Sequence, residues 1–482
     1  MTVSATHGPS ASDEGPQRVA ALLRSLGPNA RQMRRLLGLL LERSVSTIAE
    51  IVSVSGSPRR DVEHLIRTMG SDARLTGDRI EIRAPEAYSG LALGAATARD
   101  WPLEEMRSAL SAAPESIKHL DHVAATPDTL LRRAAWLDEH YELSQSRILM
   151  LGDHDATTLA FDLLGIEVGA LSVVDIDQAT LAFIDERSRA DCYFADLRLG
   201  LPEPLQDKFD LVITDPPYSA EGVSLFAARG AEALEHHEHG RLVVSYGYPP
   251  ASPALGLKVQ AALAKLGVVY EAVLPAFNRY DGAQAVGSRS SQYVLRLTRR
   301  SKKAAPAVAR RAGAAIYSHG QQAAESARGA PPVWDSIVER LRPVELFELL
   351  SRSTVRNEPV AVNLVPFFGR SLVYAALAAQ APVVELLVDN ETPGIRSASE
   401  QAQTRRLLGE VKFQRSVNGS PFTLVNVAGP SKIVAPFERL EGLGPGFDGR
   451  RPLDLPLHRL LALAELRRVG PLGYDDRTRA SM

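Results

Sequence analysis

The sequence predicts an α/β protein built around a doubly wound, largely parallel sheet. Between residues 146 and 300, apolar runs of strand character alternate with helical patterns, as in "RILMLGDHDATTLAFDLLG" and "ALSVVDIDQATLAFIDERSRA". A parallel strand pair needs a crossover connection, so this alternation is typical of a parallel sheet with helices on its faces. At the end of this stretch, "VVYEAVLPAFNRY" and "QYVLRLTRR" predict two closing strands in an antiparallel hairpin.

The residues before this sheet predict a small helical domain and a connection. Residues 1–16 are polar and rich in Ser and Pro, which predicts a disordered leader. Residues 17–90 show three helical patterns and then two short strands, the pattern of a winged-helix domain, and residues 91–145 predict connecting helix and loop. Arg59 and Arg60 would begin the third helix, so DNA binding is one interpretation. Packing, dimerisation or closure over a substrate is the other.

Two further regions follow the sheet. Residues 301–332 are rich in Ala, small polar residues and basic pairs, which predicts a partly helical linker. Residues 333–482 repeat a weaker cadence of strand, turn and helix, which predicts a C-terminal α/β domain of unknown role. Whether this domain is a degenerate duplicate is left open.

Composition excludes several classes of protein. The formal net charge of −2 provides no overall positive field toward nucleic acid or an anionic membrane. The single cysteine, Cys192, excludes an internal disulfide framework and a cysteine-based zinc site. The first residues lack the apolar core of a signal peptide, and no apolar run is long enough to cross a bilayer. We therefore expect a cytoplasmic protein without a membrane segment, and a homodimer is left open.

Aspartates follow each of the first four predicted strands of the sheet. Asp is common in turns and helix caps, so one such residue would mean little. Ligands of open α/β sheets lie beyond the carboxyl ends of the strands, however, and here four successive strand ends carry acids. The sequence therefore predicts a ligand site at this edge. Its acidic members, in strand order, are Asp153 and Asp155, Asp175 and Asp177, Asp196, and Asp215.

The position of each acid in the sheet predicts its role. A carboxylate that closes the second strand can accept hydrogen bonds from both hydroxyls of a ribose, which makes Asp175 the expected nucleoside anchor, with Asp177 beside it. Asp196 opens the turn where an adenine amino group would lie. Asp215 lies at the centre of the sheet.

Asp215 begins the tetrapeptide "DPPY", which indicates a nucleophilic amine. Pro216 and Pro217 fix the backbone angle φ and lack N–H donors, which leaves carbonyl groups to accept from an incoming amine. Tyr218 can stack on a planar group or interact with a cation. The same tetrapeptide is familiar from enzymes that methylate amino groups of nucleic-acid bases, so it does not identify the amine.

The first turn, "LGDHDATT", favours a cationic ligand. Enzymes that bind S-adenosylmethionine usually carry a glycine-rich turn here, which lets the methionine carboxylate approach the backbone. This turn has one glycine, Gly152, and two carboxylates, which disfavour a ligand carboxylate. Decarboxylated S-adenosylmethionine is a cationic ligand of the required kind, and a polyamine is a cationic acceptor.

Three segments resemble the branched-chain polyamine synthase family, that of N(4)-bis(aminopropyl)spermidine synthase. "LDHVAATPDTLLRRAAWL", which contains Asp121, is similar to an Asp-Gln…Thr…Arg segment of the family. "ILMLGDHDATTLAF" resembles its Gly-Asp-Asp-Asp turn, and "FDLVITDPPYSAEG" resembles its Asp-Pro-Pro segment. His154 stands where the family turn has an acid. Tyr218 follows the prolines where the family often has an acid, and Glu221 lies slightly downstream.

The resemblance implies a winged-helix-like domain joined to a Rossmann-like aminopropyltransferase domain with a class I methyltransferase-type sheet. The implied reaction transfers aminopropyl groups from decarboxylated S-adenosylmethionine to the secondary amine of spermidine and releases methylthioadenosine. Asp153 and Asp155 are candidates to hold the polyamine and take its proton, and His154 would take the proton if the acid it replaces has that role.

The remaining site residues divide by ligand. The predicted catalytic residues are Asp153, His154, Asp155 and Asp215. The predicted co-substrate residues are Gly152, Asp175, Asp177, Asp196 and Pro216, and the predicted polyamine residues are Asp121, Pro217, Tyr218 and Glu221. No metal is expected, because His236, His237 and His239 fit a solvated helix end.

Two alternatives remain open at this point. One is an S-adenosylmethionine-dependent methyltransferase that acts on an amino group of nucleic acid, with the N-terminal domain as its binding arm. The other is a DNA-binding regulator that senses a polyamine or a nucleoside. The acidic first turn and the net charge disfavour the first, and "DPPY" favours it.

Overall fold

The structure, a computed structural model, describes most of the chain, in two compact units. The described residues are 14–43, 45–94, 99–281, 288–312, 316–317, 331–351, 353–367, 371–429, 435–444 and 446–469. One unit contains the described residues up to Met106 together with Leu131–Arg147 and Ala160–Ala170, and the other contains the rest. This division differs from the predicted borders near residues 90 and 145, since segments on both sides of residue 145 group with the N-terminal helices.

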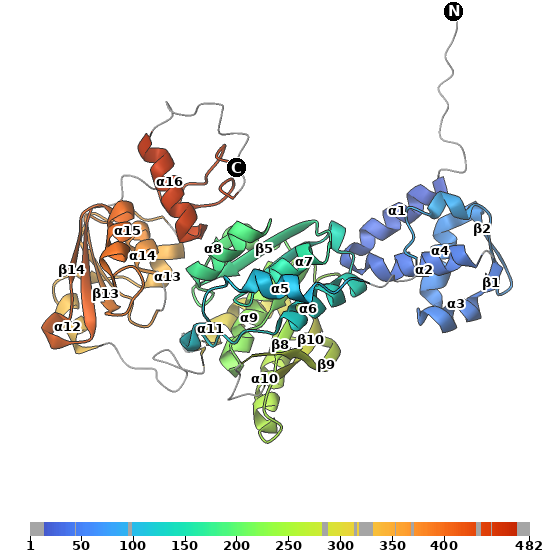
Figure 1. Ribbon diagram of the computed structural model, residues 1–482, viewed down its shortest axis with the longest axis horizontal. Helices are drawn as coiled ribbons and strands as arrows, with labels where there is room; N and C mark the ends of the chain where they lie inside the picture. The colour runs from blue at the N-terminus through green and yellow to red at the C-terminus, as the bar shows by residue number, and fades with distance from the viewer. Residues whose placement is uncertain are drawn as a thin grey trace, which may run out of the picture. The chain divides into compact units, whose positions relative to one another are not determined.

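The N-terminal residues form helices and a small sheet (Figure 1). The α-helices are α1 Glu14–Leu26, α2 Ala30–Glu42, α3 Ile48–Ser55 and α4 Arg59–Met69, and the strands are β1 Val45–Thr47, β2 Ala73–Thr76 and β3 Arg79–Ile82. The strands form an antiparallel sheet of order β1-β3-β2. The predicted helices and hairpin are present, and their designation as a winged helix stays a prediction. The predicted leader was wrong for residues 14–16, which belong to α1, and its residues 1–13 lie outside the described part.

The basic residues that begin α4 are paired with acids. The Arg59 Nε donates to Glu63 at 2.8 Å, and its Nη2 lies 3.3 Å from Asp78. The Arg60 Nε lies 3.4 Å from Asp61. Exposed ion pairs contribute little to stability, but neighbouring carboxylates weaken the attraction of a helix start for phosphate. These contacts offer little support for reading α4 as a DNA-recognition helix.

The predicted doubly wound sheet is present, with seven strands in the order β6-β5-β4-β7-β8-β10-β9. Pairing is parallel for β5 with β6, β4 with β7 and β7 with β8, and antiparallel for β10 with both β8 and β9. The strands are β4 Arg147–Leu151, β5 Ala170–Asp175, β6 Asp191–Phe194, β7 Leu211–Thr214, β8 Arg241–Tyr246, β9 Val269–Arg279 and β10 Arg289–Arg296. The α/β class and the closing hairpin are therefore confirmed.

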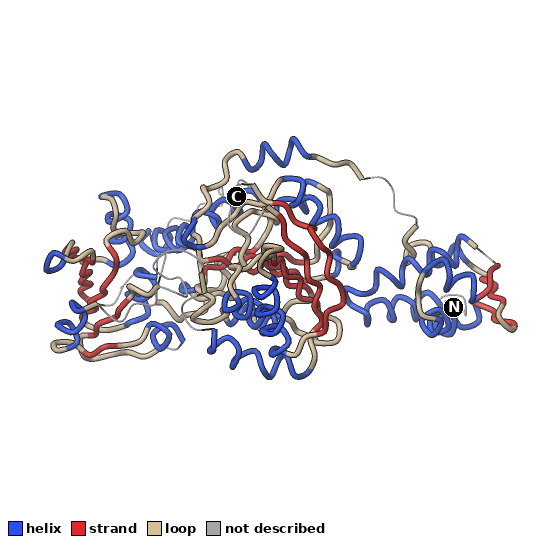
Figure 2. The backbone as a smooth tube through the Cα atoms, turned by 90° about the horizontal axis from the view of Figure 1, so that it is seen from below, coloured by secondary structure: helices blue, strands red, loops and turns tan. Residues whose placement is uncertain are grey.

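Helices run alongside these strands (Figure 2). They are α5 Leu103–Leu110, α6 Pro127–His140, α7 Thr158–Leu163, α8 Gln178–Arg187, α9 Ala220–Ala233, α10 Pro253–Leu266 and α11 Arg299–Ala312. One apolar core joins strand residues such as Val212 and Leu242 to the helices α9, α10 and α11. Ala305 and Ala309 of α11 are buried in it, so residues 301–312 are helical, as the partly helical prediction allowed, but they belong to the core and not to a linker. The small alanine side chains let this helix pack closely against α9.

The C-terminal residues form a second, smaller α/β layer, as predicted. Its sheet has the order β11-β12-β13-β15-β14, with β11, β12 and β13 parallel and β15 antiparallel to both neighbours. The strands are β11 Arg342–Pro343, β12 Val360–Asn363, β13 Val383–Asp389, β14 Val411–Gln414 and β15 Phe422–Ala428. The helices are α12 Pro332–Val338, α13 Leu346–Ser351, α14 Ser371–Ala379, α15 Ala398–Leu408 and α16 Leu457–Val469. This order does not repeat that of the seven-stranded sheet.

The edge strand β6 is covered by an arginine from the C-terminal residues. The side chain of Arg450 is 3% exposed, and its Nη1 donates to the carbonyl oxygen of Cys192 at 2.9 Å. The same guanidinium pairs with Asp191 and lies 4.2 Å from the centre of the Tyr193 ring. An exposed edge strand leaves backbone groups without partners, and this arginine satisfies one of them.

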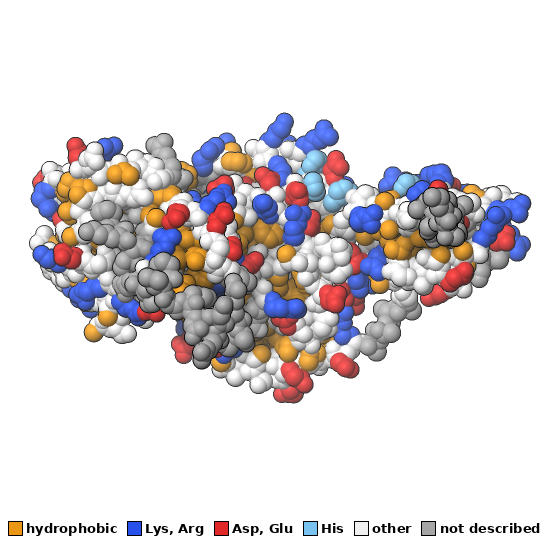
Figure 3. Space-filling model, turned by 90° about the horizontal axis from the view of Figure 1, so that it is seen from above, with side chains coloured by type: hydrophobic (Ala, Val, Ile, Leu, Met, Phe, Trp, Pro, Cys, Tyr) orange, Lys and Arg blue, Asp and Glu red, His pale blue; other side chains and the backbone are white. Residues whose placement is uncertain are grey.

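Acidic and basic side chains are interspersed over the face of the molecule shown in Figure 3, in keeping with the small net charge. Across the described ranges, every helix is too short or too polar to span a lipid bilayer.

The cover on β6 can be tested by replacing Arg450. Arg450→Ala should lower the free energy of unfolding by about 2 kcal/mol, because a buried hydrogen bond to a charged group and a cation–π contact are both lost. Urea or thermal unfolding measures the change. The control is Arg439→Ala, whose ion pair with Glu203 spans 2.7 Å but is 52% and 62% exposed and should contribute less than about 1 kcal/mol. Equal effects of the two substitutions would contradict a special role for Arg450.

Candidate active site

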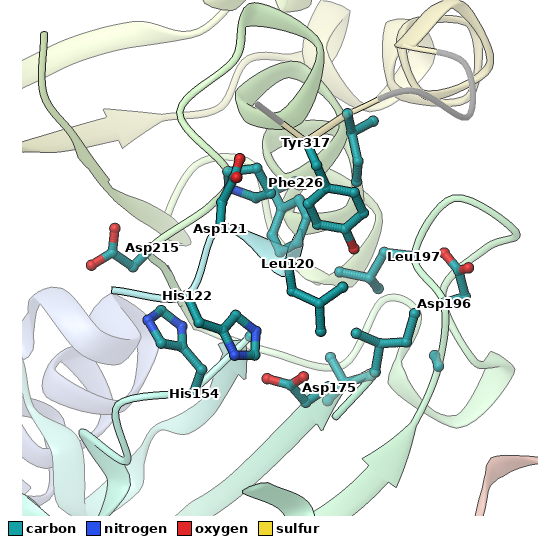
Figure 4. Close-up of a pocket in the computed structure, with 16 residues that line it drawn as sticks. Leu120, Asp121, His122, His154, Asp175, Asp196, Leu197, Asp215, Phe226 and Tyr317 are labelled. Carbon is teal, nitrogen blue, oxygen red and sulfur yellow. The ribbon is translucent and has the colours of Figure 1, made fainter. Parts of the chain in front are cut away.

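A pocket opens at the carboxyl ends of the parallel strands (Figure 4). It encloses about 520 Å³ of empty space, part of which is open to solvent. Its titratable lining residues are Asp121, His122, His154, Asp175, Asp196, Asp215 and Tyr317. The remaining lining residues are Leu120, Gly152, Val174, Ile176, Ala195, Leu197, Pro217, Phe226 and Ile316. The predicted site is therefore brought together in part, and the other predicted residues lie outside this lining.

The turn after β4 needs its single glycine. Gly152 has a φ of +76°, which an L side chain rarely adopts. A Cβ at this position would lie 3.4 Å from Cε1 of Phe226 and 4.0 Å from an oxygen of Asp175. The bare backbone thus keeps the pocket open between an aromatic ring and a carboxylate.

Asp153, predicted to be catalytic, lies in the turn before helix α7 and is not among the lining residues. Its side chain is buried, and one oxygen accepts from the backbone N–H of Thr157 at 2.9 Å. The other oxygen accepts from the backbone N–H of Thr158 at 3.1 Å and from the Thr158 hydroxyl. Burial, together with the nearby Asp155 charge, raises the pKa of Asp153, and the hydrogen bonds oppose that rise. These contacts make Asp153 a helix cap.

Asp155 also lies outside the pocket lining. Its side chain is buried, and one oxygen accepts from the Thr157 hydroxyl at 3.0 Å. Neither of the two acids of the turn lines the pocket, and their catalytic role stays a prediction. His154, between them, does line the pocket.

His154 stacks on a second histidine. The rings of His122 and His154 lie 4.5 Å apart with an interplanar angle of 14°. Nε2 of His154 lies 3.1 Å from the carbonyl oxygen of Val123, which can only accept, so we place a proton on Nε2 and the lone pair of the neutral ring on Nδ1. Burial opposes the charged ring, but the Asp155 and Asp215 carboxylates outweigh it, so the pKa of His154 is raised.

The two acids after β5, Asp175 and Asp177, have different positions, one in the pocket lining and one at the start of a helix. Asp175 lines the pocket, and its oxygens accept from the backbone N–H groups of Asp153 at 3.0 Å and Asp177 at 2.8 Å. Burial, then the Asp177 charge, raises the pKa of Asp175 to about 6. Asp177 caps helix α8 by accepting from the Ala179 N–H at 3.0 Å and the Thr180 hydroxyl at 2.8 Å. Of these two acids, only Asp175 lines the pocket.

Asp196, after β6, is paired with an arginine that sequence reasoning missed. Nε of Arg198 donates to Asp196 at 2.8 Å, and its Nη2 donates to the other oxygen at 2.5 Å. Both side chains are nearly fully buried, at 3% and 2% exposure. The negative charge at this end of the pocket is thus balanced, while the carboxylate can still accept further hydrogen bonds.

Asp215, after β7, is held by two tyrosine hydroxyls. Its oxygens accept from Tyr218 at 3.1 Å and from Tyr280 at 2.7 Å, and the two hydroxyls lie 2.8 Å apart. Burial, with the Asp215 charge next, raises the pKa of Tyr218 well above its usual value, so this hydroxyl keeps its proton. Ser290 lies 2.9 Å from the Tyr280 hydroxyl and continues the network toward the hairpin.

The segment that follows "DPPY" is tied to a distant part of the chain. Pro217 lines the pocket, whereas Pro216 is buried outside the lining and Glu221 is exposed on α9. Gly222 allows a close approach here, because a Cβ on it would lie 2.6 Å from the carbonyl oxygen of Pro217 and 3.0 Å from that of Ile316. The polyamine role predicted for Glu221 thus lacks support from its position.

Sequence reasoning missed four residues of this site: His122, Arg198, Tyr280 and Tyr317. His122 was visible in the segment that carries Asp121, whose φ of +57° turns the chain at the pocket. The other three gave no signal that a local pattern could supply. Tyr280 ends the strand β9 and Tyr317 follows α11, so only the folded chain brings them to the pocket.

Chemically, this arrangement suits a ligand with an apolar face, hydroxyl groups and positive charge. Apolar side chains and two carboxylates form one end, and Asp121, Asp215 and the histidine pair form the other (Figure 4). Among the described residues, groups of three or more His, Cys, Asp or Glu side chains that could hold a metal ion do not occur. His236 and His237 lie beside the single acids Glu235 and Glu238, at 3.7 and 3.6 Å.

Comparison with known proteins places this geometry in context. Residues 103–307 match the family described as the branched-chain polyamine synthase A C-terminal domain. The predicted resemblance is confirmed for this segment. It includes the residues that line the pocket from Leu120 to Phe226.

Two curated proteins are similar to parts of this chain. The chain is 34% identical over 189 residues to an uncharacterized protein of Methanocaldococcus jannaschii, over 38% of this chain and 46% of that protein. It is 31% identical over 139 residues to N(4)-bis(aminopropyl)spermidine synthase of Thermococcus kodakarensis, over 28% of this chain and 39% of the relative. The chain therefore spans less than half the length of either relative.

A solved structure is also similar. It is the branched-chain polyamine synthase of Thermus thermophilus, in complex with N4-aminopropylspermidine and 5'-methylthioadenosine. The sequence identity is 22% and the TM-score is 0.36, over 60% of this chain and 94% of that one.

The structural role of Asp153 makes a testable prediction. Asp153→Ala removes the acceptor of three hydrogen bonds at the start of α7 and should lower the free energy of unfolding by about 1–3 kcal/mol. Chemical denaturation measures the loss, and ligand binding to the remaining folded protein should be nearly unchanged. The matched control is Asp100→Ala, at an exposed position. A normally stable Asp153→Ala protein with strongly impaired ligand binding would instead support the catalytic role.

Proposed function

We propose that the protein transfers aminopropyl groups from decarboxylated S-adenosylmethionine to an amine of a polyamine such as spermidine. The products would be a branched polyamine and methylthioadenosine. The observation that carries this proposal is the pocket, in which Asp121, Asp175 and Asp215 converge beside apolar side chains. A doubly cationic sulfonium nucleoside and a polycation both suit such a lining. The names of the relatives of this segment support the same reaction class.

The nucleoside would lie between the ends of β5 and β6. Asp175 is positioned to accept from the ribose hydroxyls, and Asp196 from an exocyclic amino group of the base. Ile176, Leu197 and Phe226 line the same end and would cover the faces of the base. Gly152 leaves room for the sulfonium end of the molecule.

The acceptor would lie between Asp121 and Asp215. Asp215 already accepts hydrogen bonds from Tyr218 and Tyr280, which fix the orientation of its carboxylate. A carboxylate held in this way is placed to attract an ammonium group. We therefore assign it the role of positioning the cationic acceptor, with Asp121 as a second negative charge.

The proton of the reacting amine would pass to the histidine pair. The acceptor nitrogen must be neutral before it attacks the methylene carbon next to sulfur. As the new C–N bond forms, the C–S bond breaks, its electron pair stays on sulfur, and the positive charge moves to nitrogen. The Nδ1 atom of His154, whose Nε2 is fixed by the Val123 carbonyl, is the proposed base.

The surrounding architecture fits the same proposal. The strand order is consistent with a class I methyltransferase-type sheet, and the helices and hairpin before Ile82 are consistent with a winged-helix-like domain. We propose a packing or lid role for that domain over DNA binding, because Arg59 and Arg60 are engaged by acids. A cytoplasmic location remains our expectation for a protein of this activity.

Product analysis tests the reaction directly. Purified protein should raise the mass of spermidine by one or two aminopropyl units with decarboxylated S-adenosylmethionine and leave it unchanged with S-adenosylmethionine. Asp215→Asn should lower turnover by about 10²–10³-fold, as for the loss of a preorganised electrostatic group. Tyr280→Phe, which removes one hydrogen bond to that charge, should lower it by about tenfold.

A matched control is Glu221→Gln, since Glu221 is exposed and outside the pocket lining. Its turnover should equal that of the wild type. Methylated spermidine or methylated DNA with S-adenosylmethionine would refute the proposal in favour of a methyltransferase. Full turnover in Asp215→Asn would refute the role of the central carboxylate.

The raised pKa of Asp175 predicts the pH dependence of nucleoside binding. The carboxyl is ionised only above a pKa of about 6, and only the ionised form accepts from both ribose hydroxyls. Affinity for methylthioadenosine should therefore be constant above pH 7 and fall as pH drops through about 6. Calorimetric titration between pH 5 and 8 measures this profile.

Two variants distinguish the effect of Asp175 on binding from that of Asp177. Asp175→Asn should bind weakly and lose the inflection. Asp177→Asn keeps a good helix cap and should retain the inflection at a somewhat lower pH, because the Asp177 charge contributes to the raised pKa of Asp175. A profile that is the same in wild type and Asp175→Asn would show that another group titrates.

A further inference from the structure

Arg198 forms the outer support of the nucleoside end of the pocket. Its guanidinium holds both oxygens of Asp196, and its own backbone N–H donates to the same carboxylate at 3.0 Å. The guanidinium carbon lies 5.8 Å from the ring centre of Tyr317, which also lines the pocket. The direction in which Asp196 presents its remaining lone pairs therefore depends on where Arg198 is held.

The C-terminal domain, defined here as the described residues from 331 to 469, contributes further contacts of Arg198. Nη1 donates to the carbonyl oxygen of Pro366 at 3.3 Å. The guanidinium carbon lies 5.3 Å from the ring centre of Phe367. Both residues follow the strand β12, so the loop at the end of this strand meets the loop at the end of β6.

Further contacts fix the C-terminal domain against the same edge of the sheet. Phe194, the last residue of β6, stacks on Tyr374 of α14 with ring centres 4.2 Å apart. The Tyr374 hydroxyl donates to the carbonyl oxygen of Leu455 at 2.8 Å and accepts from the Gln178 amide at 3.2 Å. Near the other end of the strand, Arg450 covers the edge as described above. The position of Phe367 relative to Arg198 is thus set by a docked domain and not by one loop.

A second ion-pair cluster strengthens this docking at helix α8. Asp185 accepts from Nη2 of Arg459 at 2.6 Å and faces Nε2 of His458 at 2.8 Å. These contacts hold the pKa of Asp185 below its usual value, against the effect of burial. The helix that Asp177 caps is therefore joined to α16 by charge-assisted hydrogen bonds, which are stronger than neutral ones.

We propose that the C-terminal domain completes the nucleoside end of the pocket, with Phe367 and Pro366 as positioning residues for Arg198 and, through it, for Asp196. The proposal rests on the proposed function, in which a nucleoside occupies this end. A buried carboxylate with one partner removed would reorient or attract water, whereas the planar guanidinium fork presents it in one direction. The ligand recognised through Asp196 is the amino-bearing base of a nucleoside, because a carboxylate is an acceptor only.

The test compares phenylalanines of the same domain in the full-length protein. Phe367→Ala should raise the Kd for methylthioadenosine about threefold to tenfold, the range for losing a partly buried cation–π contact. The KM for the co-substrate should rise with it, while the KM for spermidine stays unchanged. Phe367→Tyr keeps an aromatic face and should restore the wild-type values. Phe347→Ala, at a position that is 59% exposed, should bind as the wild type does.

Hydrogen exchange supplies a second measurement that does not need turnover. Backbone amides of residues 194–199 should exchange faster in Phe367→Ala than in wild type or Phe347→Ala, while α9 is unchanged. Wild-type affinity in Phe367→Ala would overturn the proposal, and so would a loss that Phe367→Tyr shares. If wild type binds methylthioadenosine but never alkylates spermidine, the proposed function fails while this inference is still decided by the Kd values. If wild type binds no adenine nucleoside, both fail.

Discussion

The structure keeps several carboxylates buried at one edge of a sheet. Their mutual repulsion and their loss of solvation both favour unfolding of the turns that carry them, so the fold must compensate both. A buried anion is costly unless hydrogen bonds or a counter-charge compensate it. Backbone N–H groups at two helix starts compensate Asp153 and Asp177, and Arg198 compensates Asp196. Two tyrosine hydroxyls do the same for Asp215. Acids that line the pocket and acids outside it thus both have structural partners within the fold.

The sequence revealed where these acids lie but not what they do. Strand ends follow from the alternation of apolar runs and helices, so the site at the carboxyl edge was predictable. Whether an aspartate caps the next helix or faces the ligand depends on the path of the turn over two or three residues. Asp175 and Asp177 are only two residues apart, yet one lines the pocket and the other caps α8. Local sequence favours both roles equally, since Asp is common in each.

The residues that sequence reasoning missed are those that act over long separations. Tyr280 reaches Asp215 because the closing hairpin lies beside the central strands, and its hydroxyl is 65 positions away in sequence. Phe367 reaches Arg198 only because a second sheet docks on the first. Residues 301–312, alanine-rich and basic like many linkers, form a buried helix because they pack against α9 and α10. A linker and a helix with one exposed face can have the same amino-acid composition. Only the packing of the helix against the rest of the fold distinguishes them.

The imidazole at position 154 changes how the pocket can handle charge. The acids around His154 raise the pKa of its ring against the effect of burial, so they favour the charged form of the imidazole. Under the proposed function, a polyamine and a sulfonium then enter, and their charges favour the neutral ring. Binding would therefore lower the pKa of His154 before the chemical step. The neutral ring is the form that can take a proton from the acceptor ammonium. The substrates themselves would prepare the base, and the surrounding aspartates would return it to the charged state once the products leave.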